Sequence, residues 1–143
     1  MAALVDTNVL VYQFDSGSPA RMDRAHGLLR EGARTGDLVL SHQSLIEFVA
    51  VTTRTRSGRN PLLTLDSASA AVERFMMEFV ILYPDADVVR TALLGASRHG
   101  LSWYDAHQWA YAAVHRIPIL LSEDMQDGRD YGGVRVENPF RDL

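Results

Sequence analysis

Short apolar runs alternate along the chain with longer segments in which polar and apolar residues are mixed. Apolar runs of a few residues, bounded by polar or turn-forming residues, are typical of buried β-strands. The runs predict five short strands, at residues 3–5, 38–40, 80–82, 119–121 and 134–136.

The longer segments have apolar residues three or four positions apart, as on the buried face of a helix. Val72, Phe75 and Met76 show this spacing in one segment. Another segment ends before Pro118, and proline commonly follows the end of a helix. The pattern predicts helices over residues 20–36, 43–54, 67–79, 87–99 and 103–116, with a further helical stretch that opens at Thr7 and Asn8.

Strands that alternate with helices predict a parallel sheet, because each helical crossover returns the chain to the same edge of the sheet. Helices then cover both faces. No internal repeat or linker-like segment divides the sequence, so we expect one α/β domain over residues 1–143 with a central, mostly parallel sheet of about five short strands. Ligands of such sheets bind beyond the carboxyl ends of the strands.

The composition excludes several kinds of chemistry. All 14 basic residues are arginine, and the lack of lysine excludes a Walker A loop and a Schiff-base enzyme. The chain also has no cysteine, which excludes disulfides, thiolate catalysis and cysteine-bound metal centres. A net charge of −4 argues against a protein held on nucleic acid by nonspecific phosphate contacts. An enzyme that acts on nucleic acid with bound metal ions remains compatible with this charge.

The sequence also indicates where the protein works. No basic residue precedes Arg21, and Asp6 interrupts the apolar N-terminal stretch, which is unlike a signal peptide. The longest apolar run, 109–114, is far shorter than the ~20 residues that span a membrane. The absence of cysteine fits a reducing compartment. We therefore expect a cytoplasmic protein with no membrane partner.

Two acidic residues follow predicted strands. Asp6 comes directly after the run 3–5, and Asp124 follows 119–121 in the sequence Ser-Glu-Asp. Both lie at the expected carboxyl edge of the sheet, where a buried carboxylate needs cations or hydrogen-bond donors to offset its desolvation. Simpler interpretations stay open, since Asp6 could be a turn residue before an Asn8 cap and Asp124 could form an Asx turn.

Two further acids interrupt apolar helical segments. Glu47 lies in SLIEFVAV and Asp105 in SWYDAHQWAYA, both near the predicted start of a helix and so near the same edge of the sheet. Each also fits a capping box, with Ser44 three residues before Glu47 and Ser102 three residues before Asp105. The four acids together are harder to attribute to capping and turns than any one of them.

These motifs, in this order, resemble those of a known family. The segments VDTNVLVY, SLIEF, WYDAHQWAYA and LLSED look like those of the PIN-domain ribonucleases, in particular the VapC-type toxins of bacterial toxin–antitoxin pairs. The resemblance covers essentially the whole chain and implies a three-layer α/β/α PIN-like fold. It also implies a catalytic, metal-binding cluster of Asp6, Glu47, Asp105 and Asp124, supported by Thr7, Asn8, Ser122 and Asp127.

The function that this resemblance implies is a Mg²⁺-dependent endoribonuclease toxin that inhibits translation, forms a homodimer and is neutralised by a cognate antitoxin. Clustered carboxylates suit Mg²⁺, a hard cation that prefers oxygen ligands, and Mn²⁺ is its usual substitute. One alternative is a non-catalytic PIN-like module that binds RNA or acts as a scaffold, which the intact set of acids argues against. A phosphohydrolase with an aspartyl nucleophile would need a second acid where this chain has Asn8.

Three arginines, Arg54, Arg56 and Arg59, follow the helix that carries Glu47. They are candidate contacts for RNA phosphates, because the guanidinium group can bind phosphate through two hydrogen bonds. Favourable charge at a helix C-terminus is the alternative.

Two groups of large side chains are considered as contacts, one with RNA and one with a second copy of the chain. Helix 103–116 carries four aromatic residues that could stack on unpaired bases, but their helical spacing favours packing in the core. Methionine and aromatic residues at the end of helix 67–79 are predicted dimer contacts. The aromatic residues are Trp103, Tyr104, Trp109 and Tyr111, and the dimer residues are Met76, Met77 and Phe79.

Overall fold

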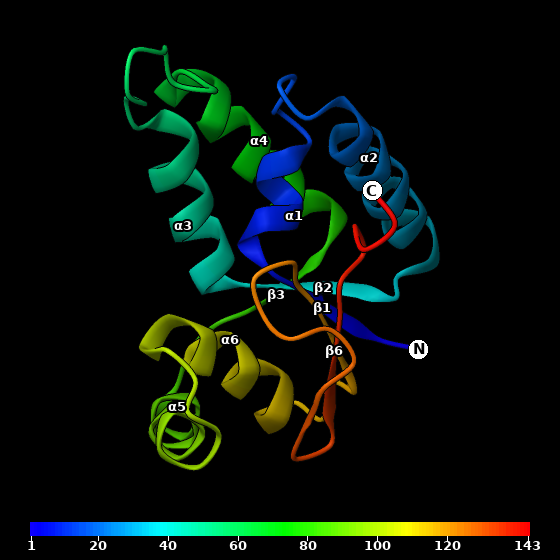
Figure 1. Cartoon of the computed structure of the whole chain (residues 1–143), viewed down its shortest axis with the longest axis vertical. Coiled ribbons are helices and arrows are strands. Elements are labelled where there is room, and N and C mark those ends of the chain that lie inside the picture. Colours follow the sequence, from blue (N-terminus) through cyan, green and yellow to red (C-terminus); the bar gives the residue numbers. More distant parts are fainter.

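The structure, a computed structural model that describes residues 1–143, places a six-stranded sheet between two groups of helices (Figure 1). The strand order is β3-β2-β1-β4-β6-β5, and all neighbouring strands are parallel except β5 and β6. The α/β class and the mostly parallel sheet are thus confirmed. The strands are β1 (Ala3–Val5), β2 (Leu38–Ser41), β3 (Val80–Leu82), β4 (Ile119–Leu121), β5 (Asp130–Tyr131) and β6 (Val134–Glu137).

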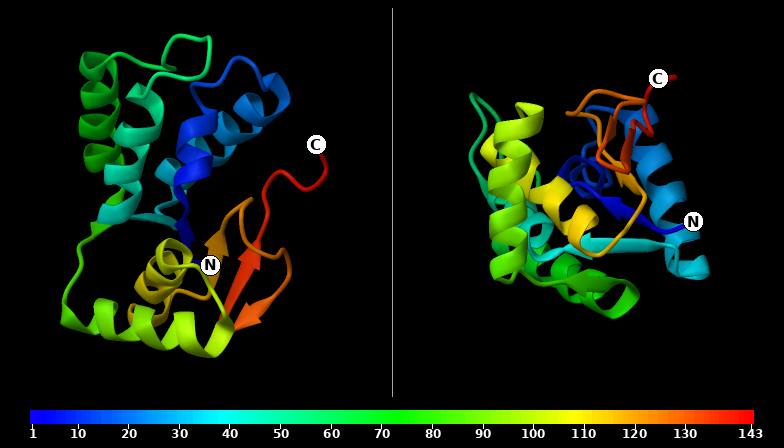
Figure 2. Two further views of the ribbon diagram at one scale, coloured as in Figure 1. Left: turned by 60° about the vertical axis from the view of Figure 1, so that its left-hand side comes forward. Right: turned by 90° about the horizontal axis from the view of Figure 1, so that it is seen from below.

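Helices cover both faces of this sheet, which confirms the three expected layers (Figure 2). Four helices pack on one face, α1 (Thr7–Tyr12), α2 (Pro19–Thr35), α3 (His42–Thr53) and α4 (Leu65–Glu78). Two pack on the other face, α5 (Ala86–His99) and α6 (Trp103–Val114). None of the six has the length and apolar character needed to cross a membrane.

Side chains of the central strand β1 contribute to both cores. Ala3 and Val5 pack in the core under α1–α4, whereas Leu4 packs in the core under α5 and α6. This division follows from the period of two in a strand, which directs successive side chains to opposite faces. All three residues are buried, as expected of a strand that is covered on both sides.

Capping side chains explain where several helices begin. Asp6 caps α1, Ser41 caps α3 and Thr64 caps α4, each accepting a hydrogen bond from a backbone N–H in the first turn. Helix α4 therefore begins at Leu65, two residues before the predicted start. Helix α2 ends at Thr35, and its C-cap Gly36 has a φ of 76°, in the left-handed region that glycine readily adopts.

Two expectations about large side chains need correction. Trp109 and Tyr111 lie in the core as predicted, but Trp103 and Tyr104 are 44% and 70% exposed, because burial in α6 begins only at Ala106. The predicted core position of these two aromatic residues is therefore wrong.

Phe79 is the second correction. Its side chain is 7% exposed and packs in the core under α1–α4, so it is not available as a dimer contact. Met76 and Met77, which precede it near the end of α4, are exposed.

Candidate active site

The candidate site lies where the strand order reverses. Strands β2 and β3 extend to one side of β1, whereas β4 and β6 extend to the other. The last residues of the two central strands, Val5 and Leu121, are paired in register. Residues that follow them, Asp6 and Ser122, therefore come together at the carboxyl edge, the position at which doubly wound sheets bind ligands.

Asp6 is held by four hydrogen bonds. Its Oδ1 accepts from the Thr7 backbone N–H at 2.7 Å and from Gln108 Nε2 at 3.0 Å. Its Oδ2 accepts from Ser122 Oγ at 2.7 Å and from Asn8 Nδ2 at 3.3 Å. Because the side chain is 5% exposed, these donors replace the water that the carboxylate loses on folding. Asp6 is thus the N-cap of α1 itself, not a turn residue before an Asn8 cap.

Burial dominates the acidity of Asp6. It raises the pKa from 3.8 to about 6, the hydrogen bonds from Ser122 and Thr7 oppose the rise, and the charges of Asp124 and Glu47 add to it. Burial also raises the pKa of Asp105, and Asp124 and Glu47 again add to the effect. The four predicted acids therefore lie close enough to affect one another electrostatically.

The pKa of Asp6 predicts how the stability of the metal-free protein depends on pH. The folded state keeps the Asp6 proton up to about pH 6, whereas the unfolded chain releases it near 3.8. The stabilising effect of this proton is complete below the unfolded value and is lost as the pH rises through the folded value. Between about pH 4 and about pH 7.5, wild type should lose up to about 3 kcal/mol of unfolding free energy relative to Asp6→Asn.

Urea unfolding of both proteins in a chelator, at a series of pH values, measures this difference. The comparison with Asp6→Asn cancels the titrating groups that do not interact with Asp6. Parallel stability curves for the two proteins would show that Asp6 does not titrate in this range.

Glu47 is bonded to the residue next to Asp6. Its Oε2 accepts from Thr7 Oγ1 at 2.9 Å, and its Oε1 accepts from Gln43 Nε2 at 2.7 Å. The capping box predicted with Ser44 is wrong, because Ser41 is the N-cap of α3 and the Ser44 backbone N–H donates to Ser41 Oγ at 3.0 Å. Helix α3 therefore presents Glu47 to the cluster from its second turn.

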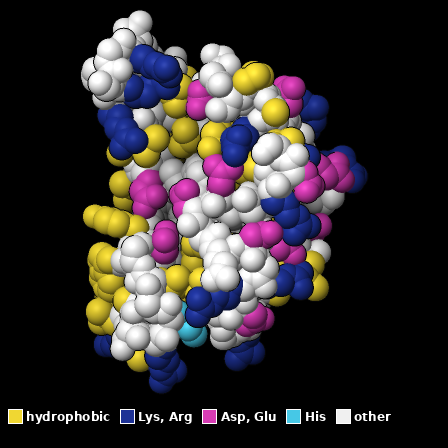
Figure 3. Space-filling view, in the orientation of Figure 1, with side chains coloured by type: hydrophobic (Ala, Val, Ile, Leu, Met, Phe, Trp, Pro, Cys, Tyr) yellow, Lys and Arg dark blue, Asp and Glu magenta, His cyan; other side chains and the backbone are white.

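Asp105 takes part both in a helix-capping pattern and in the acid cluster. Ser102 is the N-cap of α6, and its Oγ accepts from the Asp105 backbone N–H at 3.2 Å, as the capping pattern predicts. The half-buried Asp105 carboxylate nevertheless interacts with the charges of Asp124 and Glu47. Figure 3 shows the acidic side chains gathered where α3 faces α6.

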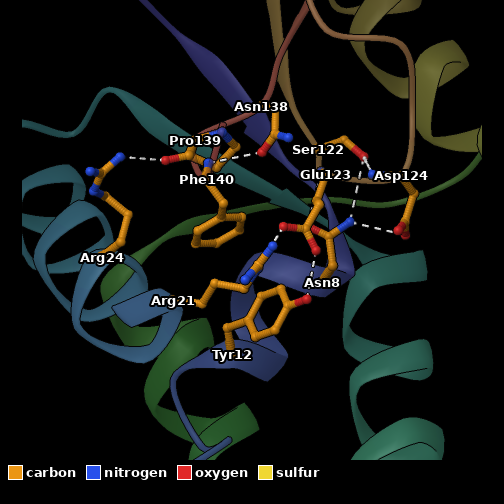
Figure 4. A network of polar contacts seen from close by, with 10 residues as sticks. All are labelled: Asn8, Tyr12, Arg21, Arg24, Ser122, Glu123, Asp124, Asn138, Pro139 and Phe140. Carbon is orange, nitrogen blue, oxygen red and sulfur yellow. Dashed lines mark hydrogen bonds and ion pairs between the residues drawn. The ribbon is translucent and has the colours of Figure 1, made fainter. Parts of the chain in front are cut away.

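Asp124 is positioned by Asn8, whose Nδ2 donates to Asp124 Oδ2 at 3.1 Å (Figure 4). The predicted Asx turn of Asp124 is replaced by a serine turn, since the Asp124 backbone N–H donates to Ser122 Oγ at 3.1 Å. The two predicted supporting residues Asn8 and Ser122 thus join Asp6 to Asp124.

The other two carboxylates of this loop are engaged elsewhere. Glu123 accepts from Tyr12 Oη and Arg21 Nε (Figure 4). Asp127, the predicted accessory acid, accepts from the Asn138 backbone N–H at 2.7 Å, which holds its pKa below the usual value, and pairs with Arg141 at 3.5 Å. The structure therefore brings Asp124, and neither of its acidic neighbours, to the cluster.

The amino-acid sequence matches the PIN domain over residues 3–126. The chain belongs to the PIN domain family. Among curated proteins, no sequence matches it.

Solved structures with the same fold include VapBC2 from Rickettsia felis bound to a DNA fragment from its promoter. That chain has a TM-score of 0.69 and 14% identity, over 96% of this chain and 98% of its own. VapC20 from Mycobacterium tuberculosis, described as a sarcin–ricin loop cleaving toxin, has a TM-score of 0.66 and 21% identity, over 86% and 90%. A toxin–antitoxin complex from Klebsiella pneumoniae has a TM-score of 0.66 and 21% identity, over 97% and 98%. These likenesses confirm the expected PIN-like fold.

Gln108 is a site residue of this PIN domain that the sequence analysis missed. It is 1% exposed and joins Asp6 to β2 and α3, because its Oε1 accepts from Ser41 Oγ at 2.8 Å and its Nε2 donates to Ser44 Oγ at 2.7 Å. A signal was present in the sequence. Gln108 lies three residues after Asp105, on the same face of the helix, within an otherwise apolar segment.

A pocket of about 340 Å³ extends from the acids of the PIN domain along α1 and α3. Glu47 and Asp124 line one part of it, and Arg54 and Arg56 line another. Arg59 does not line this pocket, although it was predicted together with them. In Figure 3, basic side chains lie beyond the end of α3 that is farther from the sheet. The pocket therefore combines a negative centre with a positive flank.

The donor atoms suit a hard divalent cation, because the cluster offers carboxylate oxygens and no sulfur. Burial and the charges of Asp124 and Glu47 raise the pKa of Asp6, so a cation beside it would favour the charged carboxylate. In the arrangement described, no three acidic or histidine side chains converge closely enough to hold an ion. Mg²⁺ usually keeps several waters and binds through one or two carboxylates, which Asp6 and its acidic neighbours would supply.

Proposed function

We propose that this PIN domain is a metal-dependent endoribonuclease of the VapC toxin type, which cleaves RNA and so inhibits translation. The observation that carries the proposal is the placement of four acids around the strand-order reversal, where the charges of Glu47 and Asp124 affect both Asp6 and Asp105. Similar solved structures support the biological setting, since they include a toxin–antitoxin complex and a sarcin–ricin loop cleaving toxin.

In this proposal the four acids hold Mg²⁺, or Mn²⁺ in its place. The ion would supply electrophilic stabilisation of the scissile phosphate and activation of the attacking water. The chain itself positions the acids: Thr7 donates to Glu47, and Asn8 links Asp6 with Asp124. Gln108 on α6 and Ser122 after β4 donate to different oxygens of Asp6. A metal-supported reaction of this kind needs no histidine as a general base.

Cleavage of a labelled structured RNA by the purified protein tests the proposal. We expect cleavage in Mg²⁺ or Mn²⁺, none in EDTA, and recovery when metal is restored in excess. The products should carry 5′-phosphate and 3′-hydroxyl ends. RNA binding without cleavage in either metal would instead favour the non-catalytic RNA-binding or scaffold module.

Arg54 provides a test of the RNA path. Arg54 lines the pocket beside the acids, so Arg54→Ala should weaken RNA binding. The slope of log Kd against log salt concentration should fall by about 1, as expected for the loss of one phosphate contact. Single-turnover cleavage at saturating protein should change little. Binding titrations across a salt series measure the slope.

Arg59→Ala is the matched control, since Arg59 lies in the same loop but outside the pocket. It should keep the wild-type slope. Equal effects of the two substitutions would mean that the loop acts through its net charge and not through a defined phosphate contact.

The proposed partners are a second copy of the chain and an antitoxin. Exposed Met76 and Met77 near the end of α4 remain the candidate dimer contacts. Light scattering of the purified protein, with Met77→Glu beside wild type, measures the number of protomers. Co-purification with the product of the neighbouring gene, followed by loss of RNA cleavage, tests neutralisation.

A further inference from the structure

A polar network joins the loop after β4 to two helices beside the candidate site (Figure 4). Glu123, in this loop, accepts from Tyr12 Oη at 2.6 Å and from Arg21 Nε at 2.7 Å. Tyr12 is the last residue of α1, and Arg21 lies in the first turn of α2. One carboxylate therefore ties three separate segments together.

Each member of this network is itself held in place. The Tyr12 ring packs edge-on against Phe140, with ring centroids 5.0 Å apart. The Arg21 guanidinium lies 5.6 Å from the centroid of the Tyr12 ring. The Glu123 side chain is 21% exposed, so its ion pair is better shielded from solvent than the surface pairs of the protein. Burial, with the Glu123 carboxylate adding, raises the pKa of Tyr12 to about 12, which keeps its hydroxyl a donor.

The network reaches Asp124 through Asn8. The Glu123 backbone N–H donates to Asn8 Oδ1 at 3.3 Å, which turns the Asn8 amide nitrogen towards the acids. That nitrogen donates to Asp124 Oδ2 at 3.1 Å and to Asp6 Oδ2 at 3.3 Å. The position of the Glu123 backbone therefore determines which end of the Asn8 amide faces the site.

Asp124 itself has little else to hold it. Its side chain is exposed, and Asn8 is its hydrogen-bond partner. Its neighbours in the chain are both fixed, Glu123 by Tyr12 and Arg21 and Met125 by burial in the core under α5 and α6. The direction of the Asp124 side chain thus depends on anchors on either side of it.

We propose that Glu123 is a positioning residue, which through Tyr12 and Arg21 fixes the loop after β4 so that Asn8 and Asp124 are aligned with Asp6. Glu123 does not join the acid cluster, because both of its oxygens are bonded to Tyr12 and Arg21. This inference rests on the proposed function, since the alignment serves metal binding at the four acids.

Metal titration of variants tests the role of Glu123. We expect Glu123→Ala to raise the Mg²⁺ concentration needed for half-maximal cleavage about tenfold, as loss of an outer-shell contact typically does, while the rate at saturating Mg²⁺ stays near wild type. Tyr12→Phe, which removes one hydroxyl, should shift the same midpoint in the same direction by a smaller factor. If Glu123→Ala fails to fold, Tyr12→Phe carries the test.

Glu31→Ala is the matched control, because Glu31 forms an exposed ion pair with Arg34 far along α2. It should leave the Mg²⁺ midpoint unchanged. An equal loss of rate at all Mg²⁺ concentrations in Glu123→Ala, with an unchanged midpoint, would overturn the positioning role.

Two readouts separate this inference from the proposed function. Calorimetric titration with Mn²⁺ measures metal affinity without RNA, and the Asn8 side-chain amide signals in an NMR spectrum report its orientation. If wild type binds Mn²⁺ but does not cleave RNA, the proposed function fails, and a weaker Mn²⁺ affinity in Glu123→Ala still supports positioning. Unchanged Mn²⁺ affinity and unchanged Asn8 signals in Glu123→Ala would overturn the positioning role of Glu123. A wild type that binds no Mn²⁺ would overturn both the positioning role and the proposed function.

Discussion

Asp6→Asn is expected to reduce RNA cleavage at saturating Mg²⁺ by about 100-fold or more, while the protein remains folded. Asparagine keeps the shape of the side chain but removes its charge, and its amide nitrogen would face groups that donate to Asp6 in the wild type. Those donors come from four different residues, so the substitution disturbs the most connected acid of the cluster.

Asp127→Asn is the control for this experiment. Asp127 lies in the loop after β4 but bonds to Asn138 and Arg141, away from the cluster. It should retain cleavage within about twofold of wild type, in the range of surface substitutions that touch no special feature. Full activity of Asp6→Asn would falsify the assignment of Asp6 as a metal ligand. A large loss of cleavage in Asp127→Asn would mean that Asp127 is an accessory acid of the site.

Gln108→Leu should have the largest effect on stability among the site variants. Leucine has a similar size but leaves Ser41 and Ser44 without the buried amide and removes one donor from Asp6. The two serines keep their hydrogen bonds to each other and to the Val5 carbonyl, so the cost is the loss of three hydrogen bonds. At about 0.5–1.5 kcal/mol each, this loss should lower the unfolding free energy by roughly 2–4 kcal/mol. Loss of a contact to a ligand should also weaken metal affinity by about tenfold.

Urea unfolding and Mn²⁺ titration measure these two effects. Gln126→Leu is the matched control, because Gln126 is exposed and has only a 3.4 Å contact with Arg129. It should change the unfolding free energy by about 0.5 kcal/mol or less. Equal stability of the two variants would mean that the Gln108 hydrogen bonds do not contribute to the fold.

The strands that the sequence predicted well are those with continuous apolar runs. Strands β1, β3 and β4 have the predicted bounds, because each is a run of three apolar residues that pairs in a parallel sheet. Strand β5 was missed, since Asp130–Tyr131 has too few residues for any periodicity. Its signal is in the turn that follows, where Gly132 and Gly133 both have positive φ, as in a two-residue hairpin turn.

The acids of the candidate site could be predicted because their position depends on topology. Parallel strands end at one edge of the sheet, and that rule places Asp6 and Asp124 at the same edge; the pairing of β1 with β4 then makes them neighbours. The choice of Asp124 over Glu123 was implied only by the family resemblance. Topology could not give it, since it depends on Tyr12 and Arg21, which lie more than a hundred residues earlier in the chain.

Exposure was the other property that periodicity could not give. Aromatic residues occur in both halves of α6, but the core begins only at Ala106. Trp103 and Tyr104 therefore lie outside it. A sequence pattern identifies the face of a helix that can be buried, while the neighbouring elements determine how far along the helix burial extends.

The pairing of β1 with β4 has a consequence for when the site can form during synthesis. Strand β1 is made first, but its neighbour on the side of Asp124 is β4, which comes after five helices have followed α1. A growing chain that has not reached Leu121 lacks the strand that places Ser122 beside Asp6 and Asp124 beside Asn8. Three of the four acids can be present in such a chain without the cluster being complete, so the candidate site is assembled only after β4 has joined the sheet.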